Sequence, residues 1–176
     1  MSGRVTIGLY NSYDPVRFHE SHRRALARAG PLALAFDCNL ATFGFPYEKE
    51  LSTPVEIANW VSTTTSIGES GAYLVELANK GRFSAFDFPK KGFPPQLGEV
   101  VVTTRKPSSE RKASLSDVRS ALKSGRSVLL VFGLGPRGLP KEVFEIGEKH
   151  LDVTAKGLSL ETCTALGAVV GALLAK

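Results

Sequence analysis

Apolar residues along the chain gather into short runs that are separated by amphipathic stretches. Residues 5–10 and 127–132 are nearly continuous apolar runs, as expected of strands that are buried on both faces of a sheet. Polar caps, Gly and Pro mark where the helices between such runs begin and end. The pattern predicts strands at residues 5–10, 32–36, 83–88, 99–104, 127–132 and 150–153, and helices at 15–29, 53–60, 70–80, 114–125, 140–146 and from 159 onward.

The helix boundaries rest on specific end signals. Asp14 followed by Pro15 is typical of an N-cap and first helical residue, and Gly30-Pro31 is expected to stop that helix. Thr53 and Glu56 have the spacing of a capping box. Ser159 is expected to cap the last helix.

Strands that alternate with helices indicate an α/β fold with a mostly parallel sheet and helices on both faces. At 176 residues the chain suits a single domain spanning residues 1–176. Residues 37–68 have the weakest pattern and form a candidate insertion.

Composition and charge narrow the choice of partner. Hydrophobic residues make up 43% of the chain and charged residues 22%, which is close to the average for globular proteins. The net charge of +5 and the pI near 9.3 favour an anionic partner such as nucleic acid, although a solvated basic face is the alternative. The basic residues form two clusters, Arg105, Lys106, Arg111, Lys112, Arg119, Lys123 and Arg126, and Arg17, Arg23, Arg24 and Arg28.

Cysteine and histidine usage predicts neither a disulfide framework nor a metal site. Cys38 and Cys163 lie far apart, and the three histidines are scattered. A cytoplasmic protein without a signal peptide is therefore expected. The apolar run at residues 165–175 is shorter than the roughly 20 residues that span a bilayer, so a buried helix is expected there. The chain has one Gln, one Met and four Asn, and scarcity of such labile residues suggests a heat-loving source.

Two glycine-bearing loops follow the last two predicted strands, where parallel sheets bind ligands. The first, Gly133-Leu-Gly-Pro-Arg-Gly138, also fits the dinucleotide pattern G-x-G-x-x-G. That interpretation fails because the helix begins after the third glycine, at Pro140. In addition, only 38 residues follow Gly138, and the nearest acidic residue that ends a strand, Asp152, lies 14 residues on rather than about 20. A phosphate-binding P-loop fails as well, since no Gly-Lys-Ser/Thr follows. The second loop is Val153-Thr-Ala-Lys-Gly157, which continues into Leu158-Ser-Leu-Glu-Thr162.

These segments resemble the SPOUT superfamily of RNA methyltransferases. Residues 128–139 look like its second motif, and residues 151–171, with Ser159-Leu-Glu161, look like its third, in which Ser-Leu-Asn opens the last helix. Asn11, with Arg24 six residues before Gly30, is similar to the first motif of the ribose-methylating branch, with a longer gap between them. An archaeal subgroup of uncharacterised role fits best.

The resemblance implies a deep C-terminal trefoil knot, a homodimer built partly on the last helix, and S-adenosylmethionine bent between the two loops. Leu151, Leu158 and Leu160 would enclose the adenine ring, and backbone groups of the glycine-rich turns would bind its edge. The implied cofactor residues are Phe132, Gly133, Leu134, Gly135, Gly138, Leu151, Val153, Thr154, Leu158, Ser159, Leu160 and Thr162.

The implied reaction is methyl transfer to RNA, with tRNA or rRNA as target; whether a base, a ribose or a protein is methylated stays open. Arg24 is the first candidate for the catalytic arginine and Arg17 competes with it; Glu161 is either a proton acceptor or only a helix cap. The alternative is a SPOUT-fold RNA-binding protein that has lost catalysis, because Glu161 and Pro136-Arg137 depart from the family pattern. The residues expected to bind RNA are Arg23, Lys106, Arg111 and Lys112.

Overall fold

The structure, a computed structural model, describes residues 2–64 and 68–176 and is built on one seven-stranded sheet. The strand order is β3-β2-β1-β6-β4-β7-β5, and every neighbouring pair is parallel. The predicted α/β class with a parallel sheet is therefore confirmed. The strands are β1 Val5–Tyr10, β2 Asn39–Phe43, β3 Phe83–Phe86, β4 Glu99–Thr103, β5 Lys112–Ala113, β6 Val128–Gly133 and β7 Lys149–Leu151.

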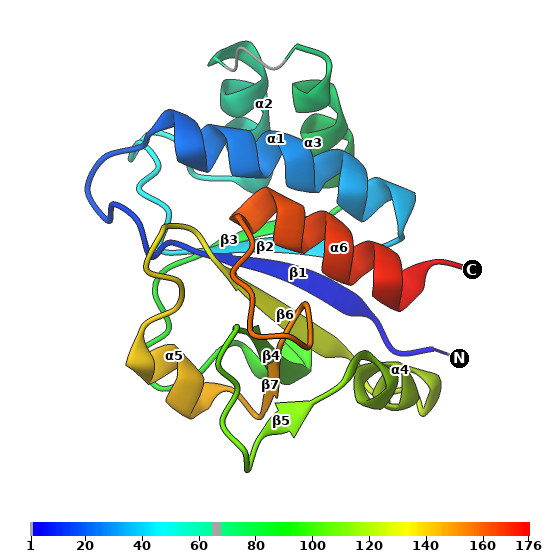
Figure 1. Cartoon of the computed structure of the whole chain (residues 1–176). Helices are drawn as coiled ribbons and strands as arrows, with labels where there is room; N and C mark the ends of the chain where they lie inside the picture. Colours follow the sequence, from blue (N-terminus) through cyan, green and yellow to red (C-terminus); the bar gives the residue numbers. More distant parts are fainter. Residues whose placement is uncertain (1, 65–67) are drawn as a thin grey trace.

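Helices cover both faces of the sheet, but unevenly. In Figure 1, α1 and α6 lie side by side over β1. One core cluster joins residues of α1, α2, α3, α4 and α6, whereas the cluster on the other face includes Val143 of α5 and Phe93 of the Pro/Gly-rich segment before β4. The helices are α1 Glu20–Ala35, α2 Pro54–Thr64, α3 Ser70–Asn79, α4 Leu115–Lys123, α5 Lys141–Ile146 and α6 Thr162–Leu174, with a 3-10 turn at Pro95–Leu97.

The central strands are apolar on both sides because both of their faces are covered. Along β6, Leu130 and Phe132 belong to the larger cluster, and Leu129 and Val131 belong to the smaller one. Side chains of a strand alternate between faces, so a continuous apolar run is what such a position requires. This explains why the strands at residues 5–10 and 127–132 could be predicted closely.

The first helix differs from the prediction at both ends. It begins at Glu20, because the Asp14 carboxylate accepts hydrogen bonds from the N–H groups of Val16 and Arg17 within a turn and caps no helix. Pro31 lies inside the helix, which continues to Ala35, so the predicted strand at residues 32–36 is wrong. The second strand is instead β2, within the candidate insertion at residues 37–68, of which residues 65–67 lie outside the described residues.

Two further boundaries near the C-terminus are corrected. The last helix begins at Thr162 with Glu161 as its N-cap, not at Ser159, and β7 ends at Leu151. Of the capping box predicted at Thr53, one half is present: Glu56 N–H donates to the Thr53 hydroxyl, but the Glu56 carboxylate accepts from Ser52 N–H. The helix α4 begins with a complete capping box between Ser114 and Asp117. Over residues 2–64 and 68–176, no helix has the length and apolar character needed to cross a bilayer.

Candidate functional site

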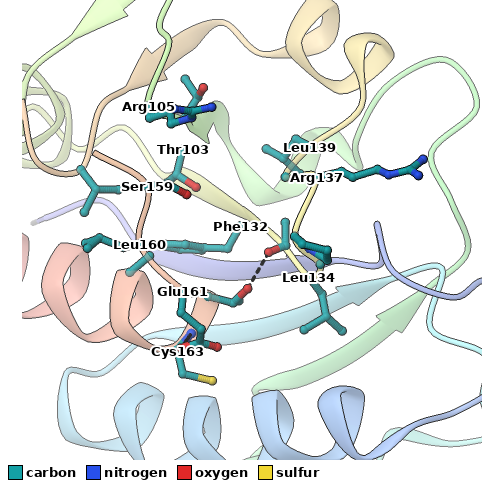
Figure 2. A pocket seen from close by; sticks show the side chains of 18 of the residues that line it. Thr103, Arg105, Phe132, Leu134, Arg137, Leu139, Ser159, Leu160, Glu161 and Cys163 are labelled. Carbon is teal, nitrogen blue, oxygen red and sulfur yellow. Dashed lines mark hydrogen bonds between the residues drawn. The ribbon is translucent and has the colours of Figure 1, made fainter. Parts of the chain in front are cut away.

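The main pocket lies where β4, β6 and β7 end, and it has a volume of about 960 Å³. Three segments that follow these strands enclose it, and Ser21 and Arg24 on the first turns of α1 add a fourth side. Figure 2 shows Ser159 to Cys163 facing Leu134 and Leu139, with Thr103 and Arg105 along a third side. This is the edge of a parallel sheet at which ligands bind.

The loop after β6 is fixed by its own glycines and by the segment after β1. Leu134 N–H donates to Tyr10 O at 2.8 Å, and the Ser12 hydroxyl donates to Leu134 O at 3.1 Å. Gly135 has a φ of +141°, and a Cβ there would lie 2.9 Å from Ser12 O. Only glycine fits this position, because any side chain would press on the Ser12 backbone while the backbone itself is strained. Gly135 therefore fixes the loop against the segment after β1 while its backbone lines the pocket.

The loop after β7 is organised around one carboxylate. Asp152 accepts hydrogen bonds from Thr154 N–H at 3.1 Å and from Gly157 N–H at 2.8 Å. The Thr154 hydroxyl in turn accepts from the N–H groups of Lys156 and Leu158, at 3.1 and 3.2 Å. The turn thus presents Leu158 to the pocket with 60% of its surface exposed.

A direct bond joins the two loops. The Thr162 hydroxyl donates to Gly133 O at 2.8 Å, drawn as a dashed line in Figure 2. This contact ties the start of α6 to the end of β6 and sets the width of the space between them. The pocket therefore depends on a side chain at the first position of the last helix.

Glu161 caps α6. Its carboxylate accepts hydrogen bonds from the N–H groups of Cys163 and Thr164, at 3.0 and 3.1 Å. Partial burial alone would raise the pKa of Glu161, but these hydrogen bonds outweigh it and the pKa is lowered. A carboxylate stabilised in this way holds a proton poorly. Burial and the neighbouring Glu161 raise the pKa of the Cys163 thiol, which keeps it in its inert protonated form.

The charged residues that line the pocket are mostly cations. Arg24, Arg105, Lys106 and Arg137 are exposed, and Glu161 is the acidic residue beside them. In the part of the chain that the structure describes, none of these four side chains forms an ion pair. Unpaired cations around a pocket attract anionic ligands and raise their local concentration. Among residues 2–64 and 68–176, no group of His, Cys, Asp or Glu side chains is arranged to hold a metal ion.

Most of the predicted cofactor residues line this pocket. Leu151 is instead buried in the core beneath it, and Thr154 acts inside its own loop. Both residues also border a smaller apolar pocket at the start of α4. The predicted residues that line the main pocket are Phe132, Gly133, Leu134, Gly135, Gly138, Val153, Leu158, Ser159, Leu160 and Thr162.

The predicted catalytic residues are only partly brought together. Arg24 and Glu161 line the pocket, whereas Arg17 is exposed outside its lining, on the segment before α1. Arg24 is thus the better placed of the two arginines. The roles themselves stay predictions.

The predicted RNA-binding residues fall into different environments. Lys106 lines the pocket, and Lys112 lies on β5 beside the smaller one. Arg111 donates to Phe144 O, Glu145 O and Gly147 O at 2.8–3.0 Å, so it holds the C-terminal end of α5. Arg23 pairs with Glu20 at 3.1 Å, and its guanidinium lies 5.4 Å from the centroids of the Phe18 and Trp60 rings. Arg111 and Arg23 thus have structural partners.

Several pocket residues escaped the sequence analysis. Thr103 and Phe144 line the pocket because β4 lies beside β6 and α5 packs against β4, which no local pattern reveals. Arg105 was named only as part of a basic cluster and not as a pocket residue. Asp152 was missed as well, although its place directly after a strand and before a Thr and a Gly is a usable signal for a turn-forming acid.

Comparison with known proteins places the chain among relatives of unknown role. It matches the family described as Protein of unknown function (DUF531) over residues 5–174. An uncharacterized protein of Methanocaldococcus jannaschii is 45% identical over 166 residues, which cover 94% of this chain and 90% of that protein. The predicted archaeal connection is supported by this relative.

Solved structures of much lower identity share the fold. A probable methyltransferase from Bordetella pertussis Tohama I has a TM-score of 0.62 at 14% identity, covering 97% of this chain and 94% of that chain. The TrmH/SpoU tRNA modifying enzyme of A. aeolicus has 0.52 at 16%, covering 96% and 74%. The SpoU methyltransferase AviRb from Streptomyces viridochromogenes, in complex with AdoMet, has 0.52 at 11%, covering 99% and 58%. The chain therefore shares the overall α/β fold of these structures.

Proposed function

The chain belongs to the DUF531 family of proteins of unknown function, and we propose that it is an S-adenosylmethionine-dependent methyltransferase that acts on RNA, with tRNA or rRNA as target. The observation that carries this proposal is the pocket, where two glycine-bearing loops joined by Thr162 and Gly133 meet a cluster of unpaired cations. The likeness of the fold to SpoU methyltransferases supports it.

The residues that line the pocket suit S-adenosylmethionine. Leu158 and Leu160 expose 60% and 36% of their surfaces beside the loop, which provides apolar contacts for an adenine ring. Gly138 has a φ of +68° and open space where a Cβ would lie, so a ligand can approach the backbone closely there. The bound cofactor would supply an electrophilic methyl group, and the protein has to align the acceptor and manage its proton.

The cations suit an RNA strand. Arg105 and Lys106 follow β4, Arg137 lies in the loop after β6, and Arg24 comes from α1, so positive charge reaches the pocket from three sides. Guanidinium groups bind phosphate oxygens in a two-pronged geometry, so Arg24 would orient a phosphate of the RNA.

Calorimetry tests the cofactor site. S-adenosylmethionine and S-adenosylhomocysteine should both bind the folded protein. Leu160→Asp should weaken the affinity at least tenfold, since a carboxylate replaces an apolar contact with the ring. Val16→Ala, at a residue 79% exposed outside the pocket lining, is the matched control. Absence of binding would end the enzyme proposal, and unchanged affinity of Leu160→Asp would show that the cofactor lies elsewhere.

The RNA part has a separate test. Binding of total RNA should weaken with salt, and the double substitution Arg105→Gln with Lys106→Gln should lower the slope of log K against log salt by about 2, one for each phosphate that is no longer neutralised. Lys91→Gln, at an exposed lysine outside the pocket lining, should leave the slope unchanged. An unchanged slope for the double variant would contradict the placement of RNA at this rim.

The alternative is an RNA-binding protein of the same fold without catalysis. Its specific support is Glu161, which acts as a helix cap, together with Arg137 in the loop where SPOUT enzymes often have an acidic residue. Transfer of labelled methyl groups to RNA from a strain lacking the gene separates the two proposals, because only the enzyme transfers them.

The knot, the homodimer and a cytoplasmic, heat-loving origin stay predictions. The outer face of α6 supports the dimer, because Gly167, Ala168 and Ala172 are exposed there and leave space for a close helix contact. Sedimentation equilibrium should give twice the monomer mass. Ala168→Arg should return the protein to a monomer.

A further inference from the structure

The lining of the main pocket is poor in groups that take up a proton. An acceptor such as a ribose hydroxyl has to lose its proton as it attacks a methyl group, and enzymes most often use a histidine or a carboxylate to remove it. The three histidines of the chain, His19, His22 and His150, all lie outside the pocket lining. Within residues 2–64 and 68–176, Glu161 is the one acidic residue that lines the pocket.

Glu161 is already engaged at the start of α6. Its Oε2 atom accepts hydrogen bonds from Cys163 N–H at 3.0 Å and from Thr164 N–H at 3.1 Å. Burial acts to raise the pKa of Glu161, but these bonds, which protonation would weaken, hold it below its ordinary value. Glu161 is therefore a fixed negative charge in the pocket and a poor proton acceptor.

The other polar side chains of the lining are donors or weak bases. Charged arginine and lysine side chains have hydrogens to donate and no lone pair to accept one, which applies to the four cations of the pocket. The Thr103 and Thr162 hydroxyls donate to carbonyl oxygens of β6, at 2.9 and 2.8 Å. Burial raises the pKa of the Cys163 thiol, which stays protonated. A serine hydroxyl, as at Ser21 and Ser159, does not take up a proton unless a base assists it.

The pocket has room for a nucleobase beside the cofactor. Its volume of about 960 Å³ is at the upper end of the range for sites that bind one small molecule. Phe144 is half-buried in the lining and adds an aromatic surface. Bases that have left their helix stack on aromatic side chains, so a base from the RNA would fit against this part of the wall.

We infer that the methyl acceptor is a ring nitrogen of a nucleobase that already carries a free lone pair, such as adenine N1, cytosine N3 or guanine N7, an inference that rests on the proposed methyl transfer. The nitrogen lone pair forms the new bond to the methyl carbon, and the sulfur keeps the pair of the broken carbon–sulfur bond. No proton leaves, so the positive charge of the sulfonium passes to the base ring. The Glu161 carboxylate, which stays ionised in the pocket, stabilises that charge.

Other acceptors fit the pocket less well. A ribose hydroxyl, an exocyclic amine, guanine N1–H and uracil N3–H all have to lose a proton when they are methylated. The described part of the lining offers no side chain suited to take it. A ring nitrogen without a hydrogen avoids the need for that step.

The position of the transferred methyl group tests the inference. Total RNA from a strain lacking the gene is incubated with the protein and labelled S-adenosylmethionine, digested to nucleosides and analysed by mass spectrometry. The label should stay with the base when the ribose is split off, on a ring nitrogen that has no hydrogen in the parent base. Label at any position that bore a hydrogen, whether ribose oxygen, amine, ring N–H or ring carbon, would overturn the inference while the proposed function stands. If no RNA takes up label, the proposed function fails and the inference fails with it.

The pH dependence of single-turnover transfer gives a second measurement. Because no proton is lost, the rate at saturating RNA and cofactor should change less than about twofold between about pH 6 and about pH 8. Glu161→Gln keeps an oxygen for the two backbone bonds but removes the charge, so it should slow transfer about tenfold at every pH. Glu50→Gln, at an exposed acid outside the lining, is the matched control and should transfer at the wild-type rate.

Two outcomes of this measurement would contradict the inference. A rate that rises about tenfold per pH unit, in the wild type or in Glu161→Gln, would show that a proton has to be removed from the acceptor. A Glu161→Gln variant that transfers as fast as Glu50→Gln would show that the carboxylate does not stabilise the charged base.

Discussion

The hydrogen bond from the Thr162 hydroxyl to Gly133 O allows the geometry of the pocket to be tested by removing a single donor atom. Thr162→Val keeps the volume and the β-branch of the side chain but removes the donor. Thr162 and Gly133 are both half-buried, so water can replace part of the missing bond. Valine at the first position of α6 leaves the Glu161 cap in place.

The size of the effect follows from the bond. A neutral hydrogen bond of this kind contributes about 0.5–1.5 kcal/mol. If the bound cofactor requires the two loops at their present separation, the variant has to recover that free energy from binding. The affinity for S-adenosylhomocysteine should then fall about 2- to 13-fold, since about 1.4 kcal/mol corresponds to a factor of ten.

Calorimetry and thermal unfolding should be measured together. Thr164→Val is the matched control, because its hydroxyl forms only a long contact of 3.4 Å with Glu161 at an exposed site. The control should bind like the wild type. If Thr162→Val also binds with wild-type affinity while remaining folded, the loop-to-loop bond does not shape the cofactor site and the reasoning is refuted.

Three further outcomes concern stability. Arg111→Met should destabilise the fold by about 1–2 kcal/mol in urea unfolding, because three carbonyls at the end of α5 lose their donor. The same variant should leave the salt slope of RNA binding unchanged. A reduced slope would show that Arg111 contacts the RNA. Gly135→Ala should lower the free energy of unfolding by about 1–3 kcal/mol, since the new Cβ would press on the Ser12 backbone and the φ at this position is positive. Gly92→Ala, where a Cβ meets open space, should leave the free energy of unfolding nearly unchanged. Equal effects of the two substitutions would contradict the loop geometry. The unfolded chain binds the His22 proton at the ordinary pKa of 6.5 and the folded chain only near 4, so stability should be intact above pH 6.5 and decline by about 3 kcal/mol as the pH falls to 4. If a His22→Gln variant loses the same amount of stability between pH 6.5 and 4, groups other than His22 cause the loss.

Sequence could predict the centre of the sheet and the C-terminal loops because both are determined locally. The apolar runs of β1 and β6 need only their own residues to be recognised, and the glycines at 133, 135 and 138 mark their loop directly. Most of the predicted cofactor residues therefore line one pocket.

The start of the chain could not be predicted because tertiary contacts override its local signals. Asp14-Pro15 has the form of a helix start, but the Asp14 carboxylate is engaged by His19 and by a turn. Gly30 followed by Pro31 is a typical signal for the end of a helix, yet Gly30 lies inside α1, where a Cβ would come within 3.0 Å of the Leu74 backbone of α3. The packing of α1 against α3 therefore keeps the helix going past Pro31.

The place of β1 in the sheet has a consequence for synthesis. β1 pairs on one side with β2 and on the other with β6, whose first residue is made 123 residues after Val5. At about 5–20 residues per second, one edge of a mostly apolar strand stays without its partner for roughly 6–25 s of synthesis. An unpaired apolar edge is a site for wrong pairing, so the nascent chain is expected to need a chaperone over that interval. The sheet of this protein can therefore be completed only after β6 has been synthesised.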